Sequence, residues 1–365
     1  MFPQLKRPTL KPHNRDDLLK KRLVLLCVIF LAACQAAPGP TLGWTQQAGI
    51  SLPAEVEVQE IPLSGPASRR SAEISGMAWY GDILILLPQF PDRFGERGSG
   101  AVFALMKSDI LNFLEGNAED KLEPTLIPFF DGGLQDAIRG YEGFEAIAFA
   151  GNRLFLTIEA SPKTMRGFIV SGFIQPDLSE IRIDASTLTE IPLQQNLSNF
   201  SDETLLIYKE KLLTIYEANG KKVNPFPVAH LFTLKPGLQG VLPFAQIEYR
   251  ITDATPPNQE GIFWAINCYF PLDEAKLRPD GDLLAERYGL GKTHRENLTV
   301  ERLIQFQIAP DAIRLVDSPP LQLRLEGDVA PRNWEAIAIL EKQGFLLATD
   351  KFPRTILGFV PFDIK

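Results

Sequence analysis

A strand–turn–strand pattern that recurs five times constrains the fold of this chain more than any other feature. It is clearest in Glu142–Pro162, where Glu145 precedes a short apolar run, Ala150-Gly151-Asn152 breaks the run, and a second apolar run ends at Glu159. Apolar runs on either side of a Gly/Asn turn are typical of β-hairpins. The five copies begin and end with polar residues, at Ser75 and Gln89, Glu145 and Glu159, Glu203 and Glu217, Asp253 and Asn267, and Glu335 and Asp350.

Each hairpin belongs to a longer unit of four predicted strands. A further apolar run follows each hairpin, at Gly100–Met106, Gly167–Ile174, Val228–Leu234, Leu303–Ile308 and Thr355–Val360. An alternating segment precedes each hairpin, at Glu57–Ser64, Leu126–Phe130, Leu188–Leu193, Gln246–Ile251 and Leu321–Leu325. Four short strands per unit, repeated in this way, indicate an all-β fold, a five-bladed β-propeller. Six blades are the alternative, and they would require a strand hidden in Lys107–Glu123 or Asp273–Val300.

The ends of the chain indicate how the ring closes. The last unit supplies three strands, ending near Phe362, and Glu57–Ser64 has the pattern of the missing fourth strand. Pairing the two would join the first and last blades and cover an open sheet edge. The propeller domain is therefore predicted to cover residues 57–365, with closure by an N-terminal strand. Within it, Ser108–Asp120 is predicted to form a helical turn or two, and Asp273–Val300 is a long insertion.

The N-terminal segment has the features of an export signal. Lys20-Lys21-Arg22 forms a positive region, and the apolar stretch Leu23–Ala33 is too short to span a bilayer. Leu31-Ala32-Ala33-Cys34 resembles a bacterial lipobox, which implies that residues 1–33 are a lipoprotein signal peptide and that Cys34 carries the lipid. Residues 34–56 would form a tether. The resemblance implies an exported protein, lipid-anchored to the bacterial cell envelope on its periplasmic or outer-surface side; an ordinary signal peptide is the alternative.

Charge and cysteine content narrow the classes of partner. The formal net charge is −8 at pH 7, and residues 1–34 are rich in Lys and Arg, so the folded body is more acidic still. Such a body is a poor partner for nucleic acid and a plausible one for cations. Beyond Cys34 the sequence contains only Cys268, which excludes a disulfide framework in the mature chain and predicts a free, buried cysteine. We expect a monomer.

The polar ends of the hairpins predict a site. The first strand of each unit should line the central axis, and a hairpin brings its own two ends together. We therefore expect an inner ring of Ser75, Glu145, Glu203, Asp253 and Glu335, and a second ring of Gln89, Glu159, Glu217, Asn267 and Asp350. Crowded carboxylates need protons or a cation, and oxygen-only ligands favour Ca²⁺. In the alternative interpretation, the acids only cap strand ends and bond backbone amides or nearby basic residues such as Arg139, Lys163, Arg332 and Lys351.

The repeats resemble those of the SdiA-regulated family of exported bacterial five-bladed propellers. The resemblance lies in Ile74-Ser-Gly-Met-Ala78, Phe144-Glu-Ala-Ile-Ala148 and Trp334-Glu-Ala-Ile-Ala338, and in the acids that end the second strands. The chain is more distantly similar to phytase-like esterase and calcium-dependent nucleotidase propellers, in which acids at the axial mouth hold Ca²⁺. The third and fourth repeats, which begin Glu203-Thr-Leu-Leu and Asp253-Ala-Thr-Pro, depart from the pattern.

Two classes of function follow. The first is a ligand-binding, partner-binding or scaffold protein with an acidic, calcium-binding top face. The alternative is a calcium-dependent hydrolase of phosphate esters, or a glycosidase in which Glu145, Glu203 and Glu335 supply an acid and a base. The phosphoesterase would need basic residues on the same face, and the insertion offers Arg278, Arg287, Lys292, His294 and Arg295. Serine-triad chemistry is not expected, because no Gly-x-Ser-x-Gly occurs and His230 lies in an apolar strand.

Overall fold

The computed structural model describes residues 52–95, 99–117, 120–326 and 331–364. Over these residues the fold is all-β and propeller-like, because the chain forms one antiparallel meander of short strands after another. The first two meanders share an eight-stranded sheet through a parallel contact between their outer strands, which pairs Phe129 with Ile181. Their strands are β3 (Ile74–Tyr80), β4 (Ile83–Pro88), β5 (Gly100–Met106), β6 (Thr125–Phe130), β7 (Tyr141–Ala150), β8 (Arg153–Ala160), β9 (Arg166–Ile174) and β10 (Ile181–Ile191).

Three further sheets complete the described part of the chain. The next sheet contains β11 (Thr204–Tyr208), β12 (Lys211–Ile215), β13 (Val228–Thr233) and β14 (Leu238–Pro243). A six-stranded sheet follows, with β15 (Arg250–Ala254), β16 (Ile262–Tyr269), β17 (Val300–Ile308), β18 (Ile313–Leu315), β19 (Leu321–Leu323) and β1 (Glu55–Val56). The last sheet contains β20 (Trp334–Leu340), β21 (Gly344–Thr349), β22 (Leu357–Pro361) and β2 (Gln59–Ile61).

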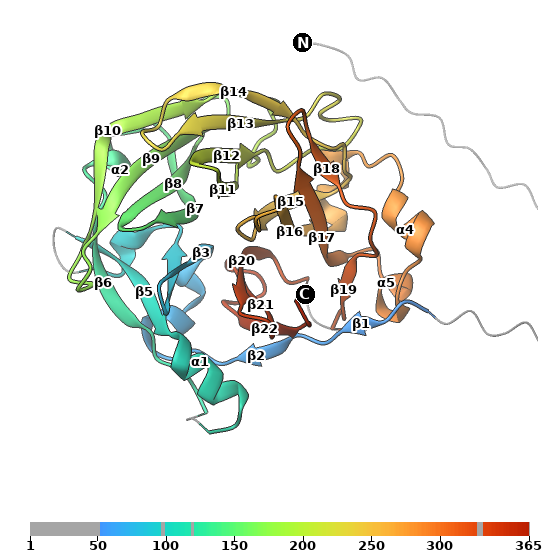
Figure 1. The fold of residues 1–365 in the computed structure, drawn as a ribbon, viewed down its shortest axis with the longest axis horizontal. Helices are drawn as coiled ribbons and strands as arrows, with labels where there is room; N and C mark the ends of the chain where they lie inside the picture. Colours follow the sequence, from blue (N-terminus) through green and yellow to red (C-terminus); the bar gives the residue numbers. More distant parts are fainter. Residues whose placement is uncertain (1–51, 96–98, 118–119, 327–330, 365) are drawn as a thin grey trace, which may run out of the picture. The chain divides into compact units, whose positions relative to one another are not determined.

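The innermost strands surround one axis. Each of β3, β7, β11, β15 and β20 packs against the next, and β20 packs against β3, so the sheets radiate outward around them (Figure 1). The core lies between the facing sheets. For example, Leu86 and Phe103 of one sheet belong to the same buried cluster as Ala338 and Leu346 of another. Middle strands such as β4, β8 and β16 are buried along almost their whole length, because both of their faces are covered, whereas the outer strands β6, β10 and β14 have exposed residues.

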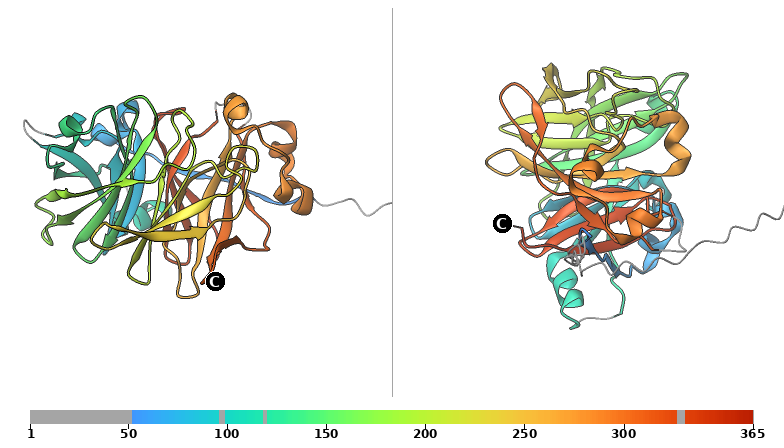
Figure 2. Two further views of the ribbon diagram at one scale, coloured as in Figure 1. Left: turned by 90° about the horizontal axis from the view of Figure 1, so that it is seen from above. Right: turned by 90° about the vertical axis from the view of Figure 1, so that its right-hand side faces the viewer.

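Short helices connect the strands. The helical segment predicted at 108–120 is α1 (Lys107–Leu114). η4 (Pro271–Asp273) leads into the predicted insertion, which contains α3 (Glu274–Leu277), α4 (Leu283–Tyr288) and α5 (Lys292–Glu296) at the periphery of the sheets (Figure 2). The remaining helices are η1 (Gly65–Ser68), η2 (Arg70–Ala72), η3 (Pro91–Arg93) and α2 (Leu134–Ala137). Of the helices in the described ranges, none has the length and apolar character needed to cross a bilayer.

The N-terminal strands join two neighbouring sheets. β2 pairs antiparallel with β22, with Glu60 opposite Gly358, as predicted for the closing strand. β1 pairs parallel with β19, so Glu55 and Val56, which the sequence interpretation assigned to the tether, already belong to a sheet. The predicted signal peptide, Cys34 and the rest of the tether up to residue 51 lie outside the described residues.

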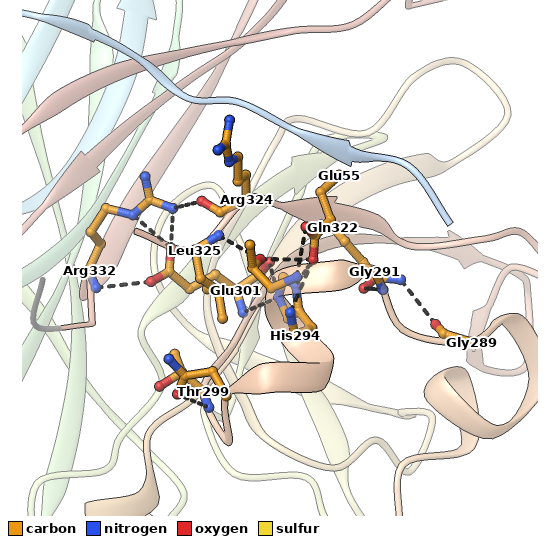
Figure 3. A network of polar contacts seen from close by, with 12 residues as sticks. Glu55, Gly289, Gly291, His294, Thr299, Glu301, Gln322, Arg324, Leu325 and Arg332 are labelled. Atoms are coloured by element: carbon orange, nitrogen blue, oxygen red, sulfur yellow. Dashed lines mark hydrogen bonds and ion pairs between the residues drawn. The ribbon is translucent and has the colours of Figure 1, made fainter. Parts of the chain in front are cut away.

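A buried polar network holds β1 in place (Figure 3). The Glu55 carboxylate accepts hydrogen bonds from the backbone N–H groups of Thr293 and His294, at 3.1 Å each, and contacts His294 Nδ1 at 2.8 Å. On the other side of the imidazole, the Glu301 N–H donates to Nε2 at 3.3 Å. Glu301 in turn accepts from Arg332 Nε at 2.9 Å. These hydrogen bonds connect β1 through α5 to Glu301 of β17 and to Arg332, which lies just before β20.

Candidate functional site

An acidic pocket of about 240 Å³ lies where the ends of the hairpins converge. Its lining contains seven of the ten residues that the sequence predicts for the two rings, namely Ser75, Gln89, Glu145, Glu159, Glu203, Glu335 and Asp350. Asn199, Arg250, Asn333, Lys351 and Phe352 complete it. We call this cavity the mouth pocket. The hairpin geometry therefore brings most of the predicted polar positions together, although they are far apart in the sequence.

Local irregularities in the inner strands help to direct these side chains. The pairing of β3 with β4 shifts between Ile74 and Gly76, around Ser75, and the pairing of β20 with β21 shifts between Trp334 and Ala336, around Glu335. A comparable shift in β7 contains Glu145. A β-bulge leaves one residue out of the ladder and re-aims its side chain, which is why bulges are frequent beside functional sites.

The fourth repeat differs from the sequence prediction. At its ring position the structure has Thr252, whose hydroxyl donates to the Trp334 carbonyl at 2.7 Å, just as the Ser75 hydroxyl donates to the Phe144 carbonyl at 2.6 Å. Asp253 lies one residue further along β15, accepts from the Ile337 N–H at 2.9 Å, and lines a different cavity. The shift arises because Pro256-Pro257 cannot continue an inner strand, which therefore begins and ends earlier than predicted.

The same shift brings in a residue that the sequence interpretation missed. The sequence pattern predicts Arg250 in an outer strand, Gln246–Ile251, whereas the outer strand in the structure is β14 and Arg250 is the first residue of β15. Its guanidinium is buried, bonds Glu217 through Nε, and donates to Glu335 at 2.9 Å and to the Asn333 side chain at 2.8 Å. Glu203 is 3.8 Å away. The proline pair after Asp253 is the sequence signal that would have placed Arg250 at the axis.

The two remaining members of the predicted second ring do not line the mouth pocket. Glu217 is fully buried and is a partner of Arg250. Asn267 donates to the backbone carbonyls of Glu248 and Arg250, at 3.0 and 3.2 Å, and accepts from Arg302 Nε at 2.8 Å. These contacts fix the backbone at the start of β15. Asn267 therefore helps to position Arg250, which does line the pocket.

Burial dominates the electrostatics of the mouth pocket. It raises the pKa of Glu145 and of Glu203 well above the ordinary range, and the neighbouring charges of Glu159 and Glu217 add to the effect. Burial also raises the pKa of Glu159 and Glu217 to about 7, and that of Glu335 to about 8, although Arg250 acts in the opposite direction on Glu217 and Glu335. Near neutral pH the pocket therefore holds both protonated and ionised carboxyl groups.

Two acceptor atoms in the pocket lack a well-formed hydrogen bond. Glu203 Oε2 is buried and lies 3.8 Å from the Arg250 guanidinium, beyond hydrogen-bond distance. Glu159 Oε1 is also buried without a well-formed hydrogen bond, although the Ser201 hydroxyl lies close enough to lower the pKa of this carboxyl. Glu145 Oε1, by contrast, accepts from Gln89 Nε2 at 3.0 Å. A buried carboxylate oxygen with such weak partners is costly, because it has lost its water and gained little in exchange. The pocket thus has unused capacity for a cation or for N–H or O–H donors.

The arrangement does not match a preformed metal site. Within the described ranges, no three Asp, Glu, His or Cys side chains are placed so as to hold a metal ion. Arg250 lies among Glu203, Glu217 and Glu335 and neutralises part of their charge. The oxygen-only donors suit a hard ion, but the guanidinium stands among them, and calcium binding stays a prediction.

The basic residues proposed for phosphate chemistry lie elsewhere. None of the five in the insertion lines the mouth pocket. Arg278 donates to the Lys222 carbonyl, Arg287 pairs with Asp317, and His294 is buried against Glu55. Of the basic residues considered as strand-end partners, Arg332 pairs with Glu301 and Lys351 reaches the pocket.

Two residues outside the rings are located as predicted. His230 is buried in β13, where its Nδ1 lies 3.5 Å from Asp202, and Cys268 is a buried free thiol. Burial raises the pKa of the Cys268 thiol far above its usual value, so this residue is not an activated nucleophile.

Comparison with known proteins adds little to this picture. No family model and no curated protein matches the chain. Among solved structures it is similar to a thermostable family-43 glycoside hydrolase, at 8% identity over 83% of this chain and 91% of that chain, with a TM-score of 0.46. It is also similar to a glucose dehydrogenase, at 12% identity over 83% of this chain and 99% of that chain, with a TM-score of 0.41. At these values the likeness supports no inference about activity.

Proposed function

We propose that this chain is a five-bladed β-propeller that acts as a binding protein, with the mouth pocket as its site for a small cation. Five blades are supported by the five inner strands around one axis, each of which opens a meander of strands. Lipid anchoring through Cys34, export to the cell envelope and membership of the SdiA-regulated family are part of the same proposal and rest on the sequence alone.

One observation carries the assignment of a cation. Five carboxyl groups line the mouth pocket, against the cations of Arg250 and Lys351. Two of the five present a buried oxygen without a well-formed hydrogen bond, at Glu159 and Glu203. A bound cation would pair with these oxygens and lower the cost of ionising their neighbours. Calcium is the cation that the sequence predicts, and an organic ammonium ion would satisfy the same oxygens.

Titration calorimetry of the purified protein at pH 8 tests the proposal, with calcium, magnesium and methylammonium chlorides as separate titrants. We expect saturable binding of at least one of them, weakened about tenfold in Glu203→Gln, which removes one charge-assisted contact. Asp311→Asn, which changes an exposed carboxylate, serves as the control and should bind like the wild type. No saturable binding of any titrant, or equal binding by Glu203→Gln, would refute the proposal.

The protonation pattern favours a hydrolase as the second candidate. Burial raises the pKa of Glu145 well above its ordinary value and that of the neighbouring Glu159 to about 7, and glycosidases use a carboxyl with a raised pKa as their general acid. Phosphate esters have less support, because the insertion supplies no basic residue to the mouth pocket. A panel of aryl glycosides and aryl phosphates, with and without chelator, tests this candidate. Turnover that Glu145→Gln abolishes would support it, and no turnover of any substrate would end it.

A further inference from the structure

A second cavity lies further along the axis, beyond the layer of acids. Its volume is about 280 Å³, and all five inner strands contribute to its wall. Each strand supplies residues a few positions beyond its mouth residue, as Met77 follows Ser75 and Ile147 follows Glu145. We call this the axial cavity.

The side chains that line the axial cavity are apolar apart from Asp253, and backbone groups of the inner strands supply polar atoms to its wall. Trp79 and Phe149 are among the lining residues, together with Ile, Leu, Ala, Met and Pro. The cavity reaches solvent at one end, because Trp79, Phe149 and Ile207 are half-buried and Pro256 is exposed. A cavity of this size, with mostly apolar side chains around it, is large enough for a benzene-sized molecule.

Asp253 is the one titratable side chain among the described residues of this wall. It is 6% exposed. Its Oδ2 accepts from the Ile337 N–H at 2.9 Å, and no lysine, arginine or histidine of the described chain forms an ion pair with it. Burial raises its pKa well above the usual value, hydrogen bonds from the Ile337 and Ala254 N–H groups act in the opposite direction, and the charge of Glu335 adds to the rise. Asp253 is thus a buried acid that faces an apolar space without a counter-charge.

We propose that the axial cavity binds a small ammonium ion with an aromatic or alkyl body, its charged head on Asp253 and its apolar part against the strand wall. The head would supply the counter-charge that the chain does not provide. A buried carboxyl group without a basic partner favours a cationic ligand over a neutral one and disfavours an anion. This site differs from the mouth pocket in its residues and in its need for an apolar ligand.

Benzylamine, benzyl alcohol and benzoate form a matched series of probes. Titrated into the full-length protein at pH 8, they are followed by calorimetry and by tryptophan fluorescence, because Trp79 lines the cavity. We expect benzylamine to bind saturably, benzyl alcohol to bind about tenfold more weakly and benzoate not to bind, since the ammonium–carboxylate contact is worth about one order of magnitude. Asp253→Asn should lower the affinity for benzylamine by the same factor and leave that for benzyl alcohol unchanged.

Two further variants separate the axial cavity from its surroundings. Glu145→Gln alters the mouth pocket and should leave benzylamine binding within twofold of the wild type, whereas Ala148→Phe fills the axial cavity and should abolish binding of both probes. Ala148 is half-buried, and circular dichroism confirms whether each variant is folded. The proposal is overturned if benzylamine binds no more tightly than benzyl alcohol, if Glu145→Gln abolishes its binding, or if Ala148→Phe leaves binding intact.

Discussion

Replacing Arg250 by methionine tests whether this side chain is the internal cation of the acidic cluster. The guanidinium contacts Glu335 and Asn333 at 2.9 and 2.8 Å and also bonds Glu217, and the two contacts with carboxylates are buried. Methionine keeps the apolar stem and removes the charge. Breaking a buried ion pair by removing one partner costs about 3–5 kcal/mol, because the other charge is left unpaired. We expect a loss of that size in the free energy of unfolding at pH 8.

The pH dependence of this loss distinguishes the explanation from simple loss of packing. At pH 5 the carboxyls with pKa values of about 7 to 8 are already protonated, so Arg250→Met should lose only about 1–2 kcal/mol, the worth of its hydrogen bonds. Urea unfolding followed by tryptophan fluorescence at the two pH values measures both losses. Arg314→Met, which breaks an exposed pair with Asp311, is the control and should leave the unfolding free energy unchanged at both pH values. An equal or larger loss at pH 5 would refute the reasoning.

Three other predictions concern pH, the N-terminal strand and the lipid. The pKa of Glu335 is raised to about 8 in the folded protein, against a value near 4.5 in the unfolded chain. The stability that Glu335 contributes is therefore fully present below pH 4.5 and is lost as the pH rises through 8. Glu335→Gln should flatten the profile of unfolding free energy against pH. Glu55→Gln weakens the hydrogen bonds to α5 and should cost about 1.5–3 kcal/mol in urea unfolding. Fatty-acid labelling in cells should be abolished by Cys34→Ala and unaffected by Cys268→Ala.

Each of these predictions has a contrary result. A wild-type profile that rises between pH 5 and pH 8.5, or that Glu335→Gln leaves unchanged, contradicts the first. Stability of Glu55→Gln equal to that of the wild type would mean that the network in Figure 3 does not hold β1. Fatty-acid label that persists in Cys34→Ala would contradict lipid attachment at Cys34.

The sequence predicted the elements with regular patterns. Around Glu145, apolar runs on both sides of a glycine turn specify β7 and β8, and Gly151 has a φ of +59°, which glycine adopts without strain. The convergence of Ser75, Glu145 and Glu335 also followed from the sequence, because equivalent positions in equivalent hairpins end at one place.

The fourth repeat shows what pattern alone could not predict. Asp253 aligned with the other acids by spacing, but a one-residue shift of the strand put Thr252 in the ring and brought Arg250 to the axis. Such a shift depends on where Pro256-Pro257 forces the strand to stop and on how β15 packs against β20, which are long-range effects. The balance of charge at the site, with an arginine among the acids, depended on that shift.

The pairing of β2 with β22 and of β1 with β19 also determines when the protein can finish folding. During synthesis on the ribosome, the strands around Glu55 and Glu60 emerge long before Leu321–Leu323 and Leu357–Pro361, to which they bond. Contacts between residues so distant in sequence form slowly, and unpaired strand edges attract other chains in the meantime. The nascent chain should therefore depend on chaperones until its last strands are available, and a chain truncated before Leu357 should aggregate.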